Sequence, residues 1–300
     1  MRVWFLLLAL LLLATPASAK VPPPPEQTLV VPTGRGPCGI AARAGVLWVT
    51  VYENDRLVAL DARSGRRETS VRIGQGACGI TVGPNAIWVA RDVPGELVRI
   101  SRGSGRIVRT EVGAWAFDVM LARGSVWVAS NRTGVISRID PRTMRSTRTY
   151  EDGIKPAGIA ACGGSIWVGH SGDATWLTAI DPGTHRVRRV DVVVKAPAWP
   201  RCIDGDLWVT TADSVIRVDA QSGALLSHIR LGGTPTEAAL GPDGLVWVTD
   251  KQRSVVHRVD RANGRIDDFQ AGPGALELVR VGSAMWVTSY AGTDVRRFGR

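Results

Sequence analysis

The sequence predicts an all-β fold: a seven-bladed β-propeller whose ring is closed by an N-terminal strand that completes the last blade. Three observations predict this fold. A short apolar segment around a Trp residue recurs seven times, with successive Trp residues 39–41 positions apart. Each repeat has room for four short strands and their turns, which is the content of one propeller blade. The last repeat stops one strand short, and a spare strand precedes the first repeat.

The Trp residues mark the second strand of each blade. Each of them follows an apolar residue and precedes a Val. Because their register is the same in every repeat, we expect these side chains to pack between neighbouring blades and not to stack against a ligand. The seven residues are Trp48, Trp88, Trp127, Trp167, Trp208, Trp247 and Trp286.

The turn between the third and fourth strands has hairpin chemistry. It runs from Asp61 to Gly65 in the first blade, and the segments 219–223 and 260–264 repeat it in later blades. The Asp side chain can bond the turn backbone, while Gly accepts a positive φ. A basic fourth strand follows, so each blade has an inner strand, a Trp strand, a third strand and an outer strand.

The two ends of the chain explain how the ring closes. The seventh repeat ends after its third strand, at residues 294–300. Residues 28–38 align without a gap on the segment that runs through Gly74, Gly76 and Cys78. We expect the N-terminal strand to complete the seventh blade, because a closed ring has no open sheet edge. Residues 28–300 then form one domain.

Two short segments precede the predicted domain. Residues 1–19 read as a cleavable secretory signal cut after Ala19, because Arg2 leads into an apolar run and the segment ends on small residues. The apolar run, about 12 residues long, is too short to span a bilayer. Residues 20–27 form a Pro-rich linker. We therefore predict a periplasmic or secreted protein without a membrane span.

The four Cys residues are predicted to form two disulfides. Cys38 and Cys78 are 40 positions apart, as are Cys162 and Cys202, and each pair falls on the inner strands of neighbouring blades. Only neighbouring inner strands bring Cα atoms within the limit of about 7 Å that a disulfide needs. Export makes oxidation the expected state. A reactive or metal-binding Cys is the alternative, although the sequence has no CxxC motif or Cys/His cluster.

The net charge of +10 comes almost entirely from Arg, since only Lys20, Lys155, Lys195 and Lys251 are Lys among 37 basic residues. The Arg residues fall on outer strands and turns all around the ring. They form no single stripe, so we expect no specific nucleic-acid partner. A general attraction to anionic surfaces is consistent with the charge.

Acidic candidates for a functional site follow from propeller topology. The loops that lead into the inner strands and the loops after the Trp strands share one face, called the loop face below. Asp118, Glu237 and Glu277 take the position that Gly39 has in the first blade, so we expect them at the mouth of the central channel. They could perform acid/base catalysis or hold a cation; alternatively, they bond strand-end amides or pair with Arg. The Arg residues within reach are Arg91, Arg201 and Arg280.

A second group of candidates is aromatic. Trp115, Trp176 and Trp199 lie outside the repeated Trp register, and with Phe117 and His170 they are expected on blades 3–5. We expect them to line a ligand site, although buried packing is the alternative. The loops after the Trp strands are expected to add three ligand contacts: Tyr52, Arg91 and Tyr290.

Among the four His residues, only His170 is predicted on the loop face, which makes it a further catalytic candidate. His185, His228 and His257 are expected at the surface. The sequence has no HExxH or GxSxG motif and no Gly-rich phosphate loop. We predict no metal site and no cofactor for a non-enzymatic protein.

The repeat resembles the virginiamycin B lyase (streptogramin lyase) family, and it is also similar to YVTN (YncE-like) exported propellers. The resemblance covers residues 28–300 and rests on Pro37-Cys-Gly-Ile40, Leu47-Trp-Val-Thr50 and Ile139-Asp140. It implies a propeller and, in the lyases, elimination with Mg²⁺ and a His directly after the inner-strand Pro of late blades. The matching positions here are Thr236 and Leu276, neither of which can act as a base.

We therefore predict an exported, non-enzymatic propeller that binds a small molecule, a glycan or an envelope protein on its loop face. Trp115, Phe117, Trp176 and Trp199 would supply apolar contacts. The alternative is a C–O lyase or hydrolase assisted by Mg²⁺, with Glu237 or Glu277 as general base and Asp118 and His170 as further candidates. A structural scaffold in an envelope complex is a third interpretation.

Overall fold

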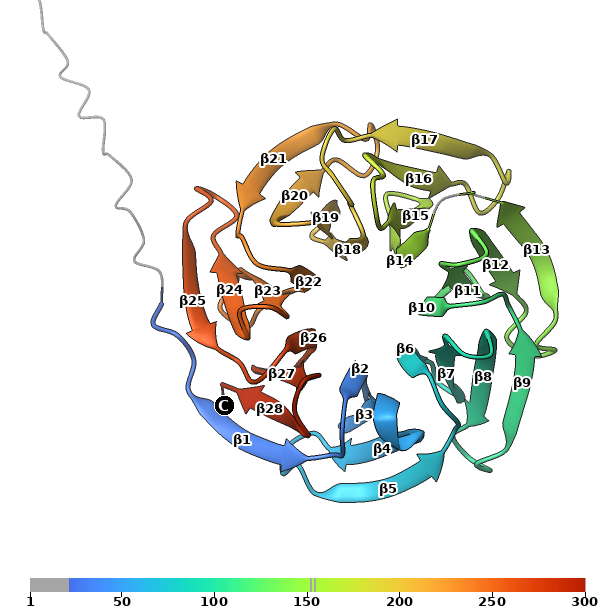
Figure 1. Ribbon diagram of the computed structural model, residues 1–300, viewed down its shortest axis with the longest axis horizontal. Helices are drawn as coiled ribbons and strands as arrows, with labels where there is room; N and C mark the ends of the chain where they lie inside the picture. The colour runs from blue at the N-terminus through green and yellow to red at the C-terminus, as the bar shows by residue number, and fades with distance from the viewer. Residues whose placement is uncertain (1–21, 152, 154, 300) are drawn as a thin grey trace, which may run out of the picture.

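Seven antiparallel four-stranded sheets surround a common axis in the computed structural model, which describes residues 22–151, 153 and 155–299 (Figure 1). The predicted all-β, seven-bladed propeller is confirmed. The inner strands β2, β6, β10, β14, β18, β22 and β26 lie nearest the axis, and the outer strands form the rim (Figure 1).

The blades follow one another along the chain. Blades 1 and 2 comprise β2 (Pro37–Arg43), β3 (Val46–Val51), β4 (Arg56–Asp61), β5 (Arg67–Arg72), β6 (Ala77–Val82), β7 (Ala86–Arg91), β8 (Glu96–Ser101) and β9 (Ile107–Glu111). Blades 3 and 4 comprise β10 (Ala116–Ala122), β11 (Ser125–Ser130), β12 (Val135–Ile139), β13 (Ser146–Glu151), β14 (Pro156–Cys162), β15 (Ser165–His170), β16 (Trp176–Ile180) and β17 (Val187–Asp191). Blades 5 and 6 comprise β18 (Trp199–Ile203), β19 (Asp206–Thr210), β20 (Ser214–Val218), β21 (Leu225–Arg230), β22 (Pro235–Leu240), β23 (Val246–Asp250), β24 (Val255–Val259) and β25 (Ile266–Gln270).

Blade 7 combines the two ends of the chain. It comprises β26 (Ala275–Val281), β27 (Ala284–Ser289), β28 (Asp294–Phe298) and β1 (Gln27–Pro32). Strand β1 runs antiparallel to β28, with Val31 opposite Val295, and lies on the rim outside it (Figure 1). The preceding segment continues along blade 6, where Arg258 donates hydrogen bonds to the carbonyl oxygens of Pro22 (2.7 Å) and Pro23 (3.1 Å).

The core consists of apolar layers between blades, and the repeated Trp residues fill them as predicted. Trp167 of blade 4 packs with Leu207 and Val209 of blade 5. Trp286 of blade 7 packs with Leu47 and Val49 of blade 1, which continues the same contact across the junction of the chain ends. Six of the seven Trp side chains are buried, and Trp48 is half-buried.

Thr residues near the ends of the Trp strands tie blades together near the axis. Thr288 Oγ1 of blade 7 accepts a hydrogen bond from the amide of Glu277 (3.0 Å) and donates one to the carbonyl oxygen of Cys38 (3.0 Å) in blade 1. Thr50 makes the same pair of bonds, to the amide of Gly39 (2.8 Å) and the carbonyl oxygen of Cys78 (2.9 Å). The Thr of the repeated Trp segment therefore links each of these blades to the next one.

Replacing Thr288 with Val, which has nearly the same shape, should lower the free energy of unfolding by about 2 kcal/mol. The change leaves the amide of Glu277 and the carbonyl oxygen of Cys38 without this hydrogen-bond partner. Thr288→Ser keeps the hydroxyl and should lose less than half as much. Urea unfolding followed by circular dichroism measures both. Equal losses in the two variants would contradict the role of the hydroxyl group.

Both predicted disulfides are confirmed. Cys38 is bonded to Cys78 and Cys162 to Cys202, with Cα–Cα distances of 5.1 and 5.4 Å. Each joins the inner strands of neighbouring blades, blades 1 and 2 and blades 4 and 5 respectively. Such bonds are typical of proteins outside the reducing cytosol.

The predicted secretory signal, residues 1–19, lies outside the described residues. Within the described part of the chain, no helix has the length and apolar character needed to cross a bilayer.

Candidate functional site

The side chain that faces the axis at the loop face comes from one position near the start of each inner strand. At Gly39 a Cβ atom would lie 2.0 Å from the carbonyl oxygen of Cys78 in the next blade, so this junction has no room for a side chain. Gly79 and Gly158 take the same position in blades 2 and 4. Blades 3, 6 and 7 place carboxylic acids there, and blade 5 places Trp199. The acids therefore come from the junctions that lack this close approach.

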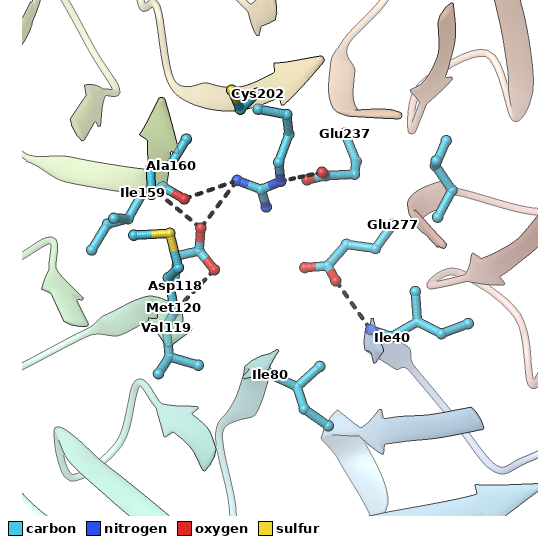
Figure 2. A pocket seen from close by; sticks show the side chains of 13 residues that line it. Ile40, Ile80, Asp118, Val119, Met120, Ile159, Ala160, Cys202, Glu237 and Glu277 are labelled. Carbon is cyan, nitrogen blue, oxygen red and sulfur yellow. Dashed lines mark hydrogen bonds and ion pairs between the residues drawn. The ribbon is translucent and has the colours of Figure 1, made fainter. Parts of the chain in front are cut away.

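These acids line a cavity of about 330 Å³ on the axis. Its polar lining consists of Asp118, Arg201, Glu237 and Glu277, and apolar side chains of the inner strands form its walls (Figure 2). The prediction that the three acids meet at the channel is therefore correct, and Arg201 joins them from blade 5.

Asp118 connects blade 3 to blade 4. Its Oδ1 accepts a hydrogen bond from the amide of Val119 (2.8 Å), and its Oδ2 accepts one from the amide of Ile159 in the next blade (3.0 Å). Arg201 Nη1 lies 3.3 Å from the same Oδ2. Asp118 is therefore both a strand-end acceptor and an ion-pair partner.

Arg201 lies between two carboxylates (Figure 2). Its Nε forms a short hydrogen bond and ion pair with Glu237 Oε1, and its Nη1 also donates to the carbonyl oxygen of Pro200 (2.8 Å). Glu237 is 6% exposed. Burial alone lowers the pKa of Arg201, but the charges of Glu237, Asp118 and Glu277 outweigh it, and the net shift is upward.

Glu277 is the acid without an ion pair. Its Oε2 accepts a hydrogen bond from the amide of Ile40 (3.1 Å) in blade 1, and its carboxyl group points toward the centre of the cavity (Figure 2). Among the described residues, no cationic side chain lies within ion-pair distance of it, and Oε1 has no hydrogen-bond partner. The cluster thus has three acids and one Arg.

Burial dominates the acidity of the two Glu residues. It raises the pKa of Glu237 to about 7; the charge of Arg201 opposes this rise, and that of Asp118 adds to it. Burial, with the charges of Glu237 and Asp118, also raises the pKa of Glu277 well above its usual range. Burial therefore favours the protonated form of the Glu277 carboxyl group.

The cluster is an unpromising site for a metal ion. The guanidinium group of Arg201 takes the position between Asp118 and Glu237 that a divalent cation would need. Within residues 22–151, 153 and 155–299, no group of three or more His, Cys, Asp and Glu side chains is arranged to hold a metal ion.

Three of the predicted aromatic residues form a row on the loop face. Trp115 and Phe117 have ring centroids 6.0 Å apart and planes tilted by 12°. Phe117 and Trp199 follow at 6.5 Å and 25°. The guanidinium group of Arg132 lies 5.9 Å from the Trp115 ring. Phe117, the middle member of this aromatic row (Trp115, Phe117 and Trp199), directly precedes Asp118, which lines the axial cavity.

Trp115 has a left-handed backbone conformation, with a φ of 57°, and its side chain is 43% exposed. Lys155 and Ala196, at the same position in blades 4 and 5, also have positive φ, of 29° and 53°. The equivalent position is Gly in blades 1, 2 and 7, where Gly36, Gly76 and Gly274 have φ of 68°, 73° and 63°. A non-Gly residue in this conformation costs on the order of 1 kcal/mol. Trp115 thus adopts an unfavourable backbone conformation while leaving much of its ring exposed.

Tyr52, Tyr290 and Arg91 lie elsewhere on the loop face. Tyr52, which begins the one described 3₁₀ turn η1 (Tyr52–Asn54), lies 6.3 Å from the Tyr290 ring and donates a 2.5 Å hydrogen bond to Asp92 Oδ2. This bond, together with burial, raises the pKa of Tyr52. The two Tyr residues belong to blades 1 and 7, across the ring from the aromatic row.

Arg91 forms its polar contacts with residues of blade 2 and of the loop that precedes it. Its Nη1 lies 2.5 Å from Glu96 Oε2, and its Nε donates to the carbonyl oxygen of Gln75 (2.8 Å). We therefore do not include it in the candidate site.

His170 and Trp176 form a separate pair. His170 is fully buried, and its Nε2 lies 3.0 Å from Thr178 Oγ1. The Trp176 ring lies 5.6 Å from His170, with the guanidinium group of Arg189 3.8 Å from its centroid. Both contacts are typical of packing, so the structure does not bring this pair into the aromatic row.

The expected surface position of His257 is wrong. It is 1% exposed, because its ring lies between Asp250 Oδ2 (3.2 Å) and Asp268 Oδ1 (2.7 Å). Its place on a third strand hides it between the Trp strand and the outer strand. All five residues of that strand, Val255–Val259, are buried, and the Val residues around His257 were the signal that could have revealed its position.

Comparisons with known proteins agree with this fold. No protein-family model matches the chain, and no curated protein sequence matches it. Among solved structures, a streptogramin B lyase is similar with a TM-score of 0.78 and 15% identity, over 89% of this chain and 94% of that one. A catalytically inactive virginiamycin B lyase from Staphylococcus aureus with quinupristin gives 0.80 and 15%, over 91% and 99%. A hydrazine synthase from Kuenenia stuttgartiensis gives 0.77 and 15%, over 91% and 98%. The chain therefore shares the fold of these lyases over nearly their whole length, at a sequence identity that establishes the fold alone.

Proposed function

We propose that this chain is an exported binding protein that takes a small molecule with a flat apolar face, such as an aromatic or sugar ring, on its loop face. The ligand lies against the aromatic row and reaches the axial cavity. Export is supported by the leader-like residues 1–19 and by the two disulfides.

The conformation of Trp115 is the observation that carries this proposal. Packing does not require a Trp at this position, because blades 1, 2 and 7 have Gly there. The ring is exposed and nearly parallel to Phe117, which is the arrangement that a flat ligand would extend. Unfavourable backbone conformations that persist in a stable fold are found preferentially at functional sites.

Trp115→Gly tests the proposal, because it restores the residue that suits the backbone. We expect the melting temperature to stay within a few degrees of the wild type, since relief of the left-handed strain offsets the lost contact with Phe117. A thermal-shift screen with indole and naphthalene derivatives and chito-oligosaccharides should find ligands whose stabilising effect disappears in this variant.

Trp199→Ala should weaken the same ligands, whereas Trp176→Phe should leave them unaffected, because that ring contacts His170 and Arg189 instead. Ligands that stabilise the wild type and Trp115→Gly equally would contradict the proposed site.

The second candidate, a lyase or hydrolase, would use the same cavity. The position of Glu277 favours it, since a buried carboxyl group with a raised pKa and a free oxygen is suited to proton transfer. The guanidinium group of Arg201 argues against the metal-assisted form. Thr236, at the position where the lyases have a His, hydrogen-bonds Thr249 and the carbonyl oxygen of Leu276. Turnover of a cyclic depsipeptide in the presence of Mg²⁺ that is lost in Glu277→Gln would establish the lyase instead of the binder.

A further inference from the structure

The charges in the axial cavity are unequal. Asp118 and Glu237 share the guanidinium group of Arg201, at 3.3 Å and at a shorter distance respectively. Glu277 has no such partner, and its one hydrogen bond, from the amide of Ile40, uses only Oε2. The cavity therefore holds one carboxyl group that forms no ion pair with any residue of the described chain.

The cavity has room for a ligand group at this carboxyl. Its volume is about 330 Å³, and the walls next to Glu277 are the apolar side chains Ile40, Ile80 and Leu278. The carboxyl group points toward the open centre (Figure 2). An alkyl chain would find apolar contacts along these walls, and a cationic head would find a carboxylate at their end.

The mouth of the cavity provides an independent contact. Phe117, in the middle of the aromatic row, is covalently next to Asp118, which lines the cavity. The aromatic row and the lining of the cavity therefore meet at two consecutive residues of blade 3.

We infer that the ligand of this propeller is an aromatic or otherwise apolar amine, whose ammonium group enters the axial cavity and pairs with Glu277. This inference rests on the proposed function and names the ligand's chemical class. The ammonium group of the ligand forms an ion pair with Glu277, as the guanidinium group of Arg201 does with Asp118 and Glu237.

Binding of such an amine is coupled to a proton. The groups facing Glu277 are Glu237, Asp118 and Arg201; burial and the two acids favour its protonated form in the free protein, and the charge of Arg201 opposes them. An ammonium ion stabilises the carboxylate, so Glu277 releases its proton to solvent when the amine binds. Affinity should therefore rise with pH while the amine stays charged.

Three probes of the same shape test the inference: 4-phenylbutylamine, 4-phenylbutanol and 4-phenylbutyrate. In isothermal titration at pH 7, the amine should bind with at least tenfold higher affinity than the alcohol. The carboxylate should bind most weakly. Titrations in phosphate and in Tris, whose ionisation enthalpies differ, should show release of up to one proton for the amine and none for the alcohol.

Glu277→Gln should remove the tenfold preference and the proton release but leave the alcohol's affinity unchanged. The matched control is Glu111→Gln on the exposed outer strand β9, which should change nothing. Trp115→Gly should weaken amine and alcohol alike.

The outcomes separate this inference from the proposed function. Equal binding of amine and alcohol, both lost in Trp115→Gly, would overturn the ammonium site and leave the aromatic site standing. Amine preference that survives Glu277→Gln would also overturn it. No binding of any probe at millimolar concentration would overturn both.

Discussion

The free energy of unfolding is expected to fall as the pH rises from about 4.5 through 7, opposite to the trend that carboxylates with a lowered pKa produce. Glu237 has an ordinary pKa of 4.5 and a pKa of about 7 in the fold. Between these values the folded protein binds more protons than the unfolded chain, so raising the pH favours unfolding. Glu277, whose pKa is also raised, extends the loss to higher pH. The loss from Glu237 alone should be on the order of 3 kcal/mol.

Glu277→Gln isolates the cause. Glutamine keeps an acceptor for the amide of Ile40 and mimics the protonated acid, so the variant should match the wild type near pH 4.5 and be the more stable of the two at pH 8. Urea unfolding at five pH values measures this, with Glu111→Gln as the control. Parallel pH profiles for the wild type and Glu277→Gln would refute the assignment.

Removing the Cys38–Cys78 bond should cost about 4 kcal/mol, because it releases the closure of a 40-residue loop in the unfolded chain. The Cys162–Cys202 bond closes a loop of the same length and should contribute a similar amount. Paired Cys→Ala variants, compared by chemical unfolding, measure each contribution. A large difference between the two pairs would show that contacts in the folded state, and not chain entropy, determine the effect.

The two bonds should differ in how fast they are reduced. Cys202 is exposed and lines the axial cavity, whereas Cys38 is 3% exposed and Cys78 half-buried. Alkylation and mass spectrometry during exposure to dithiothreitol should therefore detect free Cys202 first. The first appearance of free Cys38 would contradict this order.

The fold was predictable because its main determinant is repeated. Seven Trp residues in one register define the blades, and comparing equivalent positions places Asp118, Glu237 and Glu277 where Gly39 lies. The disulfide pairing followed from the same register. Periodicity specifies which strand a residue occupies and which way it faces, and those facts were enough for the cavity's acidic lining.

The contacts of individual side chains were less accessible. His170 and Arg91 were expected to face a ligand, but His170 packs against Trp176 and Arg91 pairs with Glu96. Such partners depend on rotamers and on neighbours distant in sequence, which a repeat pattern does not encode. The left-handed φ of Trp115 could have been anticipated, because the aligned residues in three blades are Gly.

The junctions near the axis differ in stiffness. A covalent bond fastens blades 1 and 2 and blades 4 and 5, and these junctions include the close approaches at Gly39 and Gly158. The junctions of blades 3 and 4 and of blades 7 and 1 have no disulfide, and there the side chains of Asp118 and Glu277 accept hydrogen bonds from amides of the next blade. Two of the junctions are thus covalently linked, and a ligand in the cavity would act most directly on the two that Asp118 and Glu277 cross. Any widening of the channel that accompanies binding should therefore be uneven, with hydrogen exchange changing at the amides of Ile40 and Ile159, which donate these hydrogen bonds across the two junctions, more than at the amides of Gly39 and Gly158.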